Sequence, residues 1–118
     1  MKHCHLFLAI VLCASLMSCF KDEPLNAECD IEQAYIHTDT PKSLFYQLSD
    51  TLVNVLSSEN KIRFHVRMDA DRTHLSPLFR LTDGATISPE NGSEHDFSNG
   101  SVAYTVTSQD GQWHRNYE

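Results

Sequence analysis

Hydrophobic and polar side chains alternate along the segment 61–68, "KIRFHVRM". Its apolar positions are Ile62, Phe64, Val66 and Met68, and its polar positions are Lys61, Arg63, His65 and Arg67. Successive side chains of a strand point to opposite faces, so this period of two predicts a strand with one face in the core and one in water. The charged face has two interpretations: it contacts an acidic glycan or a partner's carboxylates, or it is a solvated row that protects a sheet edge.

A second alternation runs through 101–107, "SVAYTVT", and "QWHRNYE" follows it closely. The intervening "SQDG" predicts a hairpin with a four-residue loop. The same period places Trp113 and Tyr117 together on the inward face of the last strand, so core packing is the favoured interpretation for both. The alternative is that these rings are exposed and stack on sugars, which makes Trp113 and Tyr117 candidate glycan contacts.

Shorter strand candidates fill most of the remaining chain, separated by turns rich in Pro, Asn and Gly. They are 31–38, 51–56, 78–81 and 85–87, while 41–48 fits either one helical turn or a loop between sheets. Short strands at regular spacing, without a sustained helical period, predict an all-β fold. We expect an antiparallel immunoglobulin-like β-sandwich over residues 31–118.

The N-terminus carries an apolar run, Leu6 to Leu16, preceded by Lys2. This run is too short to span a membrane and has the length of a signal-peptide core. The residues that end it, Leu16-Met17-Ser18-Cys19, resemble the lipobox of bacterial lipoproteins. The resemblance implies that residues 1–18 are a signal peptide, that Leu16 and Ser18 are recognised by the signal peptidase, and that Cys19 is lipidated, for example with palmitate. Two or three acyl chains would make a lasting membrane anchor.

Charged residues follow the cysteine directly in "FKDEP". Lys21, Asp22 and Glu23 resemble the surface-export signal of lipoproteins from glycan-utilising Gram-negative gut bacteria, and the alternative is a charged spacer that keeps the chain extended. We therefore expect residues 19–30 to be a flexible tether. The expected location is the outer membrane, with the protein lipid-anchored and exposed on the cell surface.

Charge and cysteine content narrow the function further. The formal net charge of −7 argues against a nucleic-acid partner, since phosphate binding needs clustered Lys and Arg. Cys4 and Cys13 lie in the predicted signal peptide and Cys19 carries the predicted lipid. Cys29 would then be the remaining free thiol, which excludes an intrachain disulfide and fits either a reactive group or a small buried side chain.

Two polar clusters suggest chemistry without completing a site. Counted from Asp69, the sixth and twelfth positions of an EF-hand loop would fall on His74 and Arg80, where Gly and Glu are needed. A second cluster, Glu94-His95-Asp96, has paired carboxylates as glycoside hydrolases do, but nothing in the sequence sets their spacing or supplies a cleft. We therefore predict no catalytic, metal or cofactor site and a protein that is not an enzyme. The "NGS" triplets at Asn91 and Asn99 are interpreted as turns.

Several segments together resemble one family. They are "PLNAECDIEQAYIH", "LFYQLSDTLVNV", "GATISPENGS" and "DFSNGSVAYTVTSQDGQWHRNY", and they are similar to the N-terminal region of lipoproteins that carry a putative carbohydrate metabolism domain (PCMD). The resemblance implies an immunoglobulin-like module followed by a larger β-rich domain, which is absent from these residues. The last strand candidate reaches Glu118 without a closing turn, so either the strand is short or the chain is part of a longer protein.

The function implied by this resemblance is that of a spacer, or stalk, on the cell surface. It would hold a carbohydrate-related domain or a partner protein away from the membrane. The alternative is a glycan-binding module of a polysaccharide-utilisation system. Expected partners are the membrane, through the lipid, and glycans or glycan-utilisation proteins.

Overall fold

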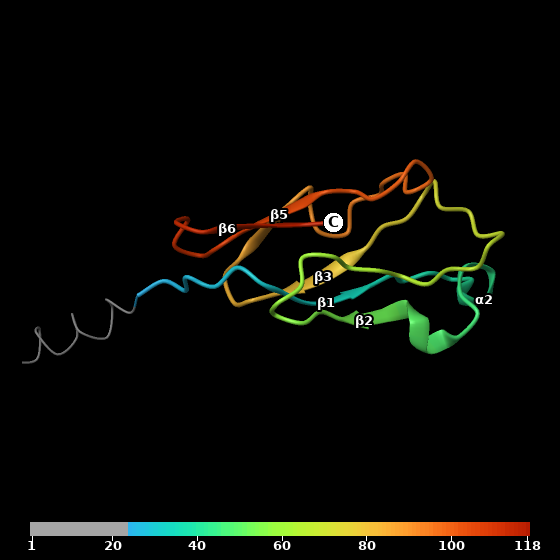
Figure 1. The fold of residues 1–118 in the computed structure, drawn as a ribbon, viewed down its shortest axis with the longest axis horizontal. Helices are drawn as coiled ribbons and strands as arrows, with labels where there is room; N and C mark the ends of the chain where they lie inside the picture. The colour runs from blue at the N-terminus through green and yellow to red at the C-terminus, as the bar shows by residue number, and fades with distance from the viewer. Residues whose placement is uncertain (1–23) are drawn as a thin grey trace, which may run out of the picture.

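Eight short elements make up the part of the chain that the computed structural model describes, residues 24–118 (Figure 1). They are β1 (Ile31–Tyr35), α2 (Pro41–Leu44), the 3-10 helix η1 (Leu48–Thr51), β2 (Leu52–Asn54), β3 (Leu78–Leu81), β4 (Thr86–Ser88), β5 (Tyr104–Thr107) and β6 (His114–Tyr117). Segment 41–48, for which a helical turn and a loop were both open, begins with one helical turn. Within residues 24–118 no helix has the length and apolar character needed to cross a membrane.

The strands form two three-stranded antiparallel sheets. Their strand orders are β2-β1-β3 and β4-β5-β6, and Figure 1 shows the two sheets as separate layers. The strand predicted at 78–81 is confirmed at both ends as β3. The other predicted strands are present but shorter or shifted by a residue, except the one at 61–68, where no strand forms. The prediction of an all-β antiparallel sandwich is therefore confirmed.

The core is built from the facing sides of the two sheets. Ile31, Ala34 and Phe79 come from one sheet, and Tyr104, Val106 and Tyr117 come from the other. The rings of Phe79 and Tyr104 meet edge to face with centroids 4.7 Å apart, which joins the layers at their centre. A second buried cluster, formed by Ile36, Leu44, Phe45 and Leu75, lies beside α2.

The hairpin predicted near the C-terminus is confirmed. Thr107 pairs with His114, and the backbone N–H of Ser108 donates to the carbonyl of Trp113 at 2.9 Å. The open loop is therefore 109–112, one residue later than the sequence suggested. It still turns at Gly111, whose φ of 73° is in the region that glycine enters without strain.

The strand predicted at 61–68 is not part of either sheet. Its alternation is partly real, since Ile62, Phe64 and Val66 are half-buried, but Met68 is 98% exposed instead of inward. Alternation reports which side chains face the core, and it does not supply a neighbouring strand for the backbone. The segment is called here the 61–67 edge. Among residues 24–118, its backbone is hydrogen-bonded only near its ends, where the Ile62 N–H donates to the Glu118 carbonyl and the Arg67 N–H donates to the Leu44 carbonyl.

An asparagine side chain covers the outer edge of β3. Asn91 accepts the backbone N–H of Phe79 through Oδ1 and donates through Nδ2 to the Phe79 carbonyl, both at 2.8 Å. The amide therefore pairs with β3 as a neighbouring strand would, and it satisfies backbone groups that an edge strand otherwise leaves open. Asn91 and Asn99 both lie in turns, as predicted.

Candidate functional site

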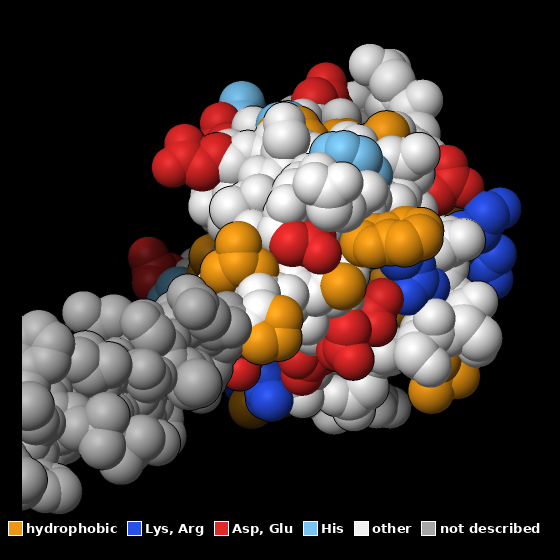
Figure 2. Space-filling model, turned by 90° about the vertical axis from the view of Figure 1, so that its left-hand side faces the viewer, with side chains coloured by type: hydrophobic (Ala, Val, Ile, Leu, Met, Phe, Trp, Pro, Cys, Tyr) orange, Lys and Arg blue, Asp and Glu red, His pale blue; other side chains and the backbone are white. Residues whose placement is uncertain are grey.

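The residues predicted to direct export and anchoring lie outside the described part of the chain. They are Leu16, Ser18, Cys19, Lys21, Asp22 and Glu23, all within residues 1–23. What the structure does describe is the junction between the predicted tether and the sandwich. Figure 2 looks onto this end of the molecule and shows separate hydrophobic patches among acidic side chains.

Asn26 attaches the start of the described chain to two loops of the sandwich. Its backbone N–H donates to Gln109 Oε1 at 2.9 Å, and its Nδ2 donates to the carbonyl of Asp83 at 3.2 Å. The N–H of Asp110 donates in turn to the Asn26 carbonyl at 3.2 Å. Gln109 lies so close to Gly84 that a Cβ there would be 2.5 Å from Gln109 Cδ.

A second set of bonds continues the junction toward β1. The Asp30 N–H donates to the Thr82 hydroxyl at 2.8 Å, and the Thr82 N–H donates to the Asp30 carbonyl at 3.0 Å. Residues 26–30, predicted as the end of a flexible tether, are therefore hydrogen-bonded to the sandwich. Cys29 lies among them, half-buried against the core, and burial raises the pKa of its thiol, which disfavours a reactive thiolate.

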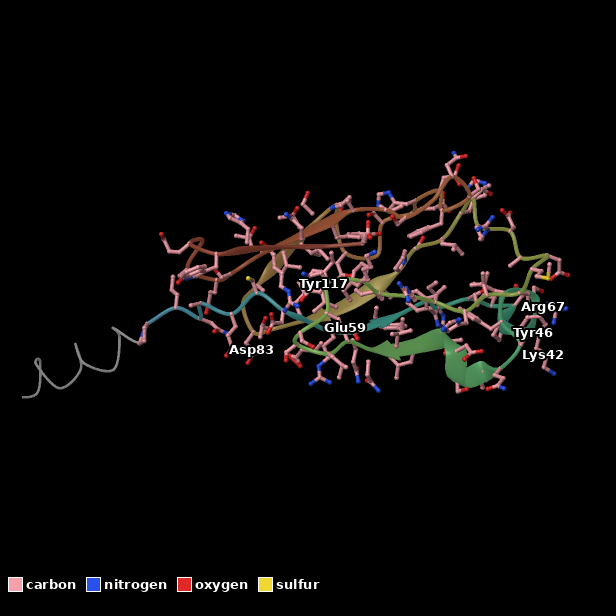
Figure 3. All side chains as sticks on the ribbon, viewed as in Figure 1. Lys42, Tyr46, Glu59, Arg67, Asp83 and Tyr117 are labelled. Atoms are coloured by element: carbon pink, nitrogen blue, oxygen red, sulfur yellow. The ribbon has the colours of Figure 1, made fainter. Side chains whose placement is uncertain are left out.

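Arg115 adds a polar network beside this junction. Its guanidinium reaches Asp30 Oδ1 at 2.6 Å, Asn60 Oδ1 at 2.8 Å and the Glu59 carbonyl at 2.7 Å. It also covers the ring of Tyr117, with 4.7 Å between Arg115 Cζ and the ring centroid. β6, the chain before β1 and the 59–60 turn are thus tied together by one side chain. Figure 3 shows Glu59 and Tyr117 close to one another in the projected view.

The two predicted aromatic candidates have opposite environments. Tyr117 is 3% exposed, and its hydroxyl accepts the Ile31 N–H at 3.1 Å, so its predicted place in the core is confirmed. Trp113 is 61% exposed, and the prediction that it packs in the core is wrong. Trp113 precedes β6, in the loop that Figure 1 shows extending toward the N-terminal end. The alternation of β6 therefore does not extend to Trp113, and the other sheet does not cover its ring.

A different exposed aromatic residue lies at the opposite end of the sandwich. The guanidinium of Arg67 lies over the ring of Tyr46, with Cζ 4.7 Å from the centroid, and Tyr46 is 64% exposed. Figure 3 shows Lys42, Tyr46 and Arg67 together at this end. Nothing in the sequence points to this pair, because the two residues belong to segments that are 21 positions apart and have no local signal in common.

The predicted basic row is present along the 61–67 edge. Lys61 forms an ion pair with Glu118 at 3.4 Å, and Arg67 forms one with Asp69 at 3.1 Å. Between them, Arg63 and His65 are exposed and make no ion pair within residues 24–118. An open hollow of about 380 Å³ lies between Arg63 and the end of β2. An apolar groove of about 260 Å³ lies beside the inward face of the same edge, lined by Phe64, Val66, Phe97 and Val102.

One carboxylate near each of the two polar clusters stabilises a turn. Asp71 accepts from the N–H and hydroxyl of Thr73, and Asp96 does the same with Ser98. These bonds lower the pKa of both carboxyls, and the bond from the side-chain hydroxyl has the larger effect. His74 lies 3.3 Å from Glu94 at an exposed position. Among the described residues no three His, Cys, Asp or Glu side chains converge on a metal-sized site.

Comparison with known proteins finds a matching family and similar solved structures. The family model described as "SGBP, N-terminal" matches residues 44–118. A crystal structure from Bacteroides thetaiotaomicron VPI-5482, described as a "putative glycoside hydrolase", is similar with a TM-score of 0.60 and 33% sequence identity. The match covers 81% of this chain and 25% of that protein, so the chain spans about a quarter of its relative. No curated protein matches the chain.

The matched range contains most of the fold just described. Residues 44–118 include the 61–67 edge, the Asn91 turn and the terminal hairpin with Trp113. The family match therefore covers well over half of the chain and five of the six strands of residues 24–118. We conclude that this chain belongs to the family of SGBP N-terminal domains.

Proposed function

We propose that the chain is a lipid-anchored, non-catalytic module that spaces a glycan-handling domain or partner from the bacterial outer membrane. The family name, SGBP, denotes surface glycan-binding proteins, which supports a role in glycan capture at the cell surface. Residues 1–18 would be the signal peptide, Cys19 the lipidated residue and residues 31–118 the rigid part. The outer-membrane location and the export role of Lys21, Asp22 and Glu23 belong to the same proposal.

The observation that carries the spacer role is the junction at Asn26. It fixes the chain that leads from the anchor to one end of the sandwich, next to Gln109 and Asp83. β6 begins at that end and runs away from it (Figure 1). The chain therefore leaves β6 heading away from the Asn26 junction, so a domain placed after β6 would continue away from the anchor.

The resemblance to PCMD lipoproteins adds detail to this proposal. We propose that the sandwich is immunoglobulin-like and that a β-rich carbohydrate-related domain follows it. The structural relative supports this layout, because this chain matches only 25% of that protein. The hydrolase activity in the relative's description stays with that protein. Here Asp71 and Asp96 stabilise turns.

The anchor is tested by membrane fractionation of Cys19→Ser, with Cys29→Ser as the matched control. Cys29 lies against the core and follows the predicted cleavage site by ten residues in the sequence, so its variant should remain in the membrane fraction while Cys19→Ser becomes soluble in the periplasm. Surface exposure is tested by protease treatment of intact cells, where replacing Lys21, Asp22 and Glu23 with Ala should protect the protein. Membrane retention of Cys19→Ser would refute the lipid anchor.

A second candidate function is direct glycan binding, and the exposure of Trp113 favours it. Exposed indole rings stack on the apolar faces of sugars, and the loop holds the Trp113 backbone through Ser108. Trp113 is the single tryptophan, so binding is followed by calorimetric titration with polysaccharides, which should give heat that is lost in Trp113→Ala and kept in Tyr46→Ala, an exposed aromatic at the other end. No heat with any glycan tested would leave only the spacer role.

A further inference from the structure

The contact between Glu118 and the 61–67 edge has the hydrogen-bond pattern of a parallel β-bridge. The Glu118 N–H donates to the Asn60 carbonyl at 3.0 Å, and the Ile62 N–H donates to the Glu118 carbonyl at 2.8 Å. One residue bonded to the two neighbours of its partner is the repeat unit of a parallel ladder. Lys61 and Glu118 are the bridged pair, and their side chains lie on the same face, 3.4 Å apart.

Beyond this bridge the edge continues without a neighbour. Among the hydrogen bonds of residues 24–118, none involves a backbone group of Arg63, Phe64, His65 or Val66. Because strand backbone groups alternate in direction, the N–H and C=O of Phe64 and the N–H of Val66 point the same way as the Ile62 N–H that meets Glu118. They form an open row that continues the ladder in the direction in which β6 runs.

The side chains beside this row specify what would fit there. On the outer face, Lys61 already pairs with an acidic residue, and Arg63 and His65 repeat at the same two-residue spacing without an acidic partner in the described chain. On the inner face, Phe64 and Val66 border the apolar groove of about 260 Å³. A strand that is acidic at outward positions and apolar at inward positions would satisfy both faces.

We propose that the 61–67 edge receives an extended segment, running parallel to it, in which apolar and acidic residues alternate, and that this segment leads from β6 into the following domain. The inference rests on the proposed function, which includes such a domain. The segment would close the apolar groove, extend the β4-β5-β6 sheet by its contact with residues 62–66, and carry the chain further from the Asn26 junction. The 61–67 edge would then be the site that joins this module rigidly to the following domain.

The test adds a segment to the full chain and follows the edge amides. Joining Val-Glu-Val-Glu-Val to Glu118 places the two acidic residues beside Arg63 and His65. We expect hydrogen exchange at the Phe64 and Val66 amides to slow by at least about tenfold and the Tm to rise by on the order of 5 °C. The matched control, Val-Lys-Val-Lys-Val, should give neither change, and Arg63→Glu combined with His65→Glu should restore both with the Lys segment.

The outcomes separate the competing occupants. Unprotected Phe64 and Val66 amides in the Glu extension would overturn the proposal, and so would equal protection by the Glu and Lys extensions. If the unextended chain sediments as a dimer with both amides already protected, a second copy occupies the edge and the proposal is wrong. The reading frame after Glu118 gives an independent check, since a stop codon or basic residues at its second and fourth positions would also contradict it. None of these results depends on Cys19, whose variant tests the anchor separately.

Discussion

The hydroxyl of Tyr117 accepts a hydrogen bond from the backbone N–H of Ile31 at 3.1 Å, which links the last strand of one sheet to the first strand of the other. Tyr104 is also buried in the core, but its hydroxyl makes no hydrogen bond to any described residue. Removing the Tyr117 hydroxyl would leave a buried N–H unsatisfied, whereas removing the Tyr104 hydroxyl breaks no protein bond.

Tyr117→Phe should therefore lower the free energy of unfolding by about 1–2 kcal/mol, and Tyr104→Phe should change it by less than about 0.5 kcal/mol. Urea denaturation of the two variants, made in the same background, measures the difference. Equal losses of unfolding free energy in the two variants would show that the hydrogen bond between Ile31 and Tyr117 contributes no stability of its own.

Stability should also fall at alkaline pH. Burial raises the pKa of both Tyr104 and Tyr117 above the ordinary value. The folded state therefore holds these protons more tightly than the unfolded chain, so the stability is complete below about pH 10 and is lost as pH rises through the folded-state pKa values. The double Tyr→Phe variant should show a smaller loss of stability above about pH 10 in the same denaturation assay. An unchanged pH slope would contradict the assignment to these tyrosines.

The two Asn-Gly-Ser triplets provide a matched pair of substitutions. Asn91 makes two bonds of 2.8 Å to the β3 backbone, while Asn99 is an exposed turn residue. Asn91→Ala should cost about 1–3 kcal/mol of unfolding free energy, because the Phe79 N–H and carbonyl lose their partner, and Asn99→Ala should cost less than about 0.5 kcal/mol. Thermal denaturation of both variants tests this, and a comparable Tm in the two would refute the role of Asn91 as an edge cover.

A pair of glycines tests the junction at Asn26. Gly84 and Gly111 both have positive φ, 78° and 73°, but only the Gly84 position is packed against Gln109, with nothing within 4 Å of a Cβ at Gly111. Both alanine variants carry similar backbone strain, and Gly84→Ala must in addition displace the Gln109 side chain that binds Asn26. The Glu28 N–H donates to Asn26 Oδ1 at 3.0 Å, so it depends on the same residue. We expect hydrogen exchange at the backbone amides of Asn26 and Glu28 to speed up in Gly84→Ala and to stay unchanged in Gly111→Ala. Equal exchange in the two variants would show that Gln109 does not hold the junction.

The features that the sequence predicted well are local ones. The β5–β6 hairpin depends on a short loop with Gly111 and on alternation within a few residues of it, and both signals are contained in one stretch. The 61–67 edge shows the limit of the same signal, because Phe64 and Val66 are half-buried as alternation requires while their backbone groups depend on a partner elsewhere in the sequence.

The parts of the site that the sequence missed are contacts between distant residues. Asn26 meets Gln109 across a separation of 83 residues, and Arg115 meets Asp30 across 85. Neither contact has a local signature, so residues 26–30 looked like flexible tether. The prediction that Trp113 is buried was wrong for a related reason. Alternation gives the direction of a side chain but not the point at which the opposite sheet ends.

The position of β1 has a mechanical consequence for an anchored protein. The chain from Asn26 leads directly into β1, which has a neighbour on each side, β2 and β3. Tension applied at the membrane would pull β1 along its own length and load its hydrogen bonds to both neighbours at once, in shear, rather than peeling them apart one by one. If the chain is anchored at Cys19 as proposed, the seven residues from Cys19 to Asn26 span at most ~25 Å before a load reaches Asn26. A pull on the anchor would then be borne by a strand that is hydrogen-bonded on both edges.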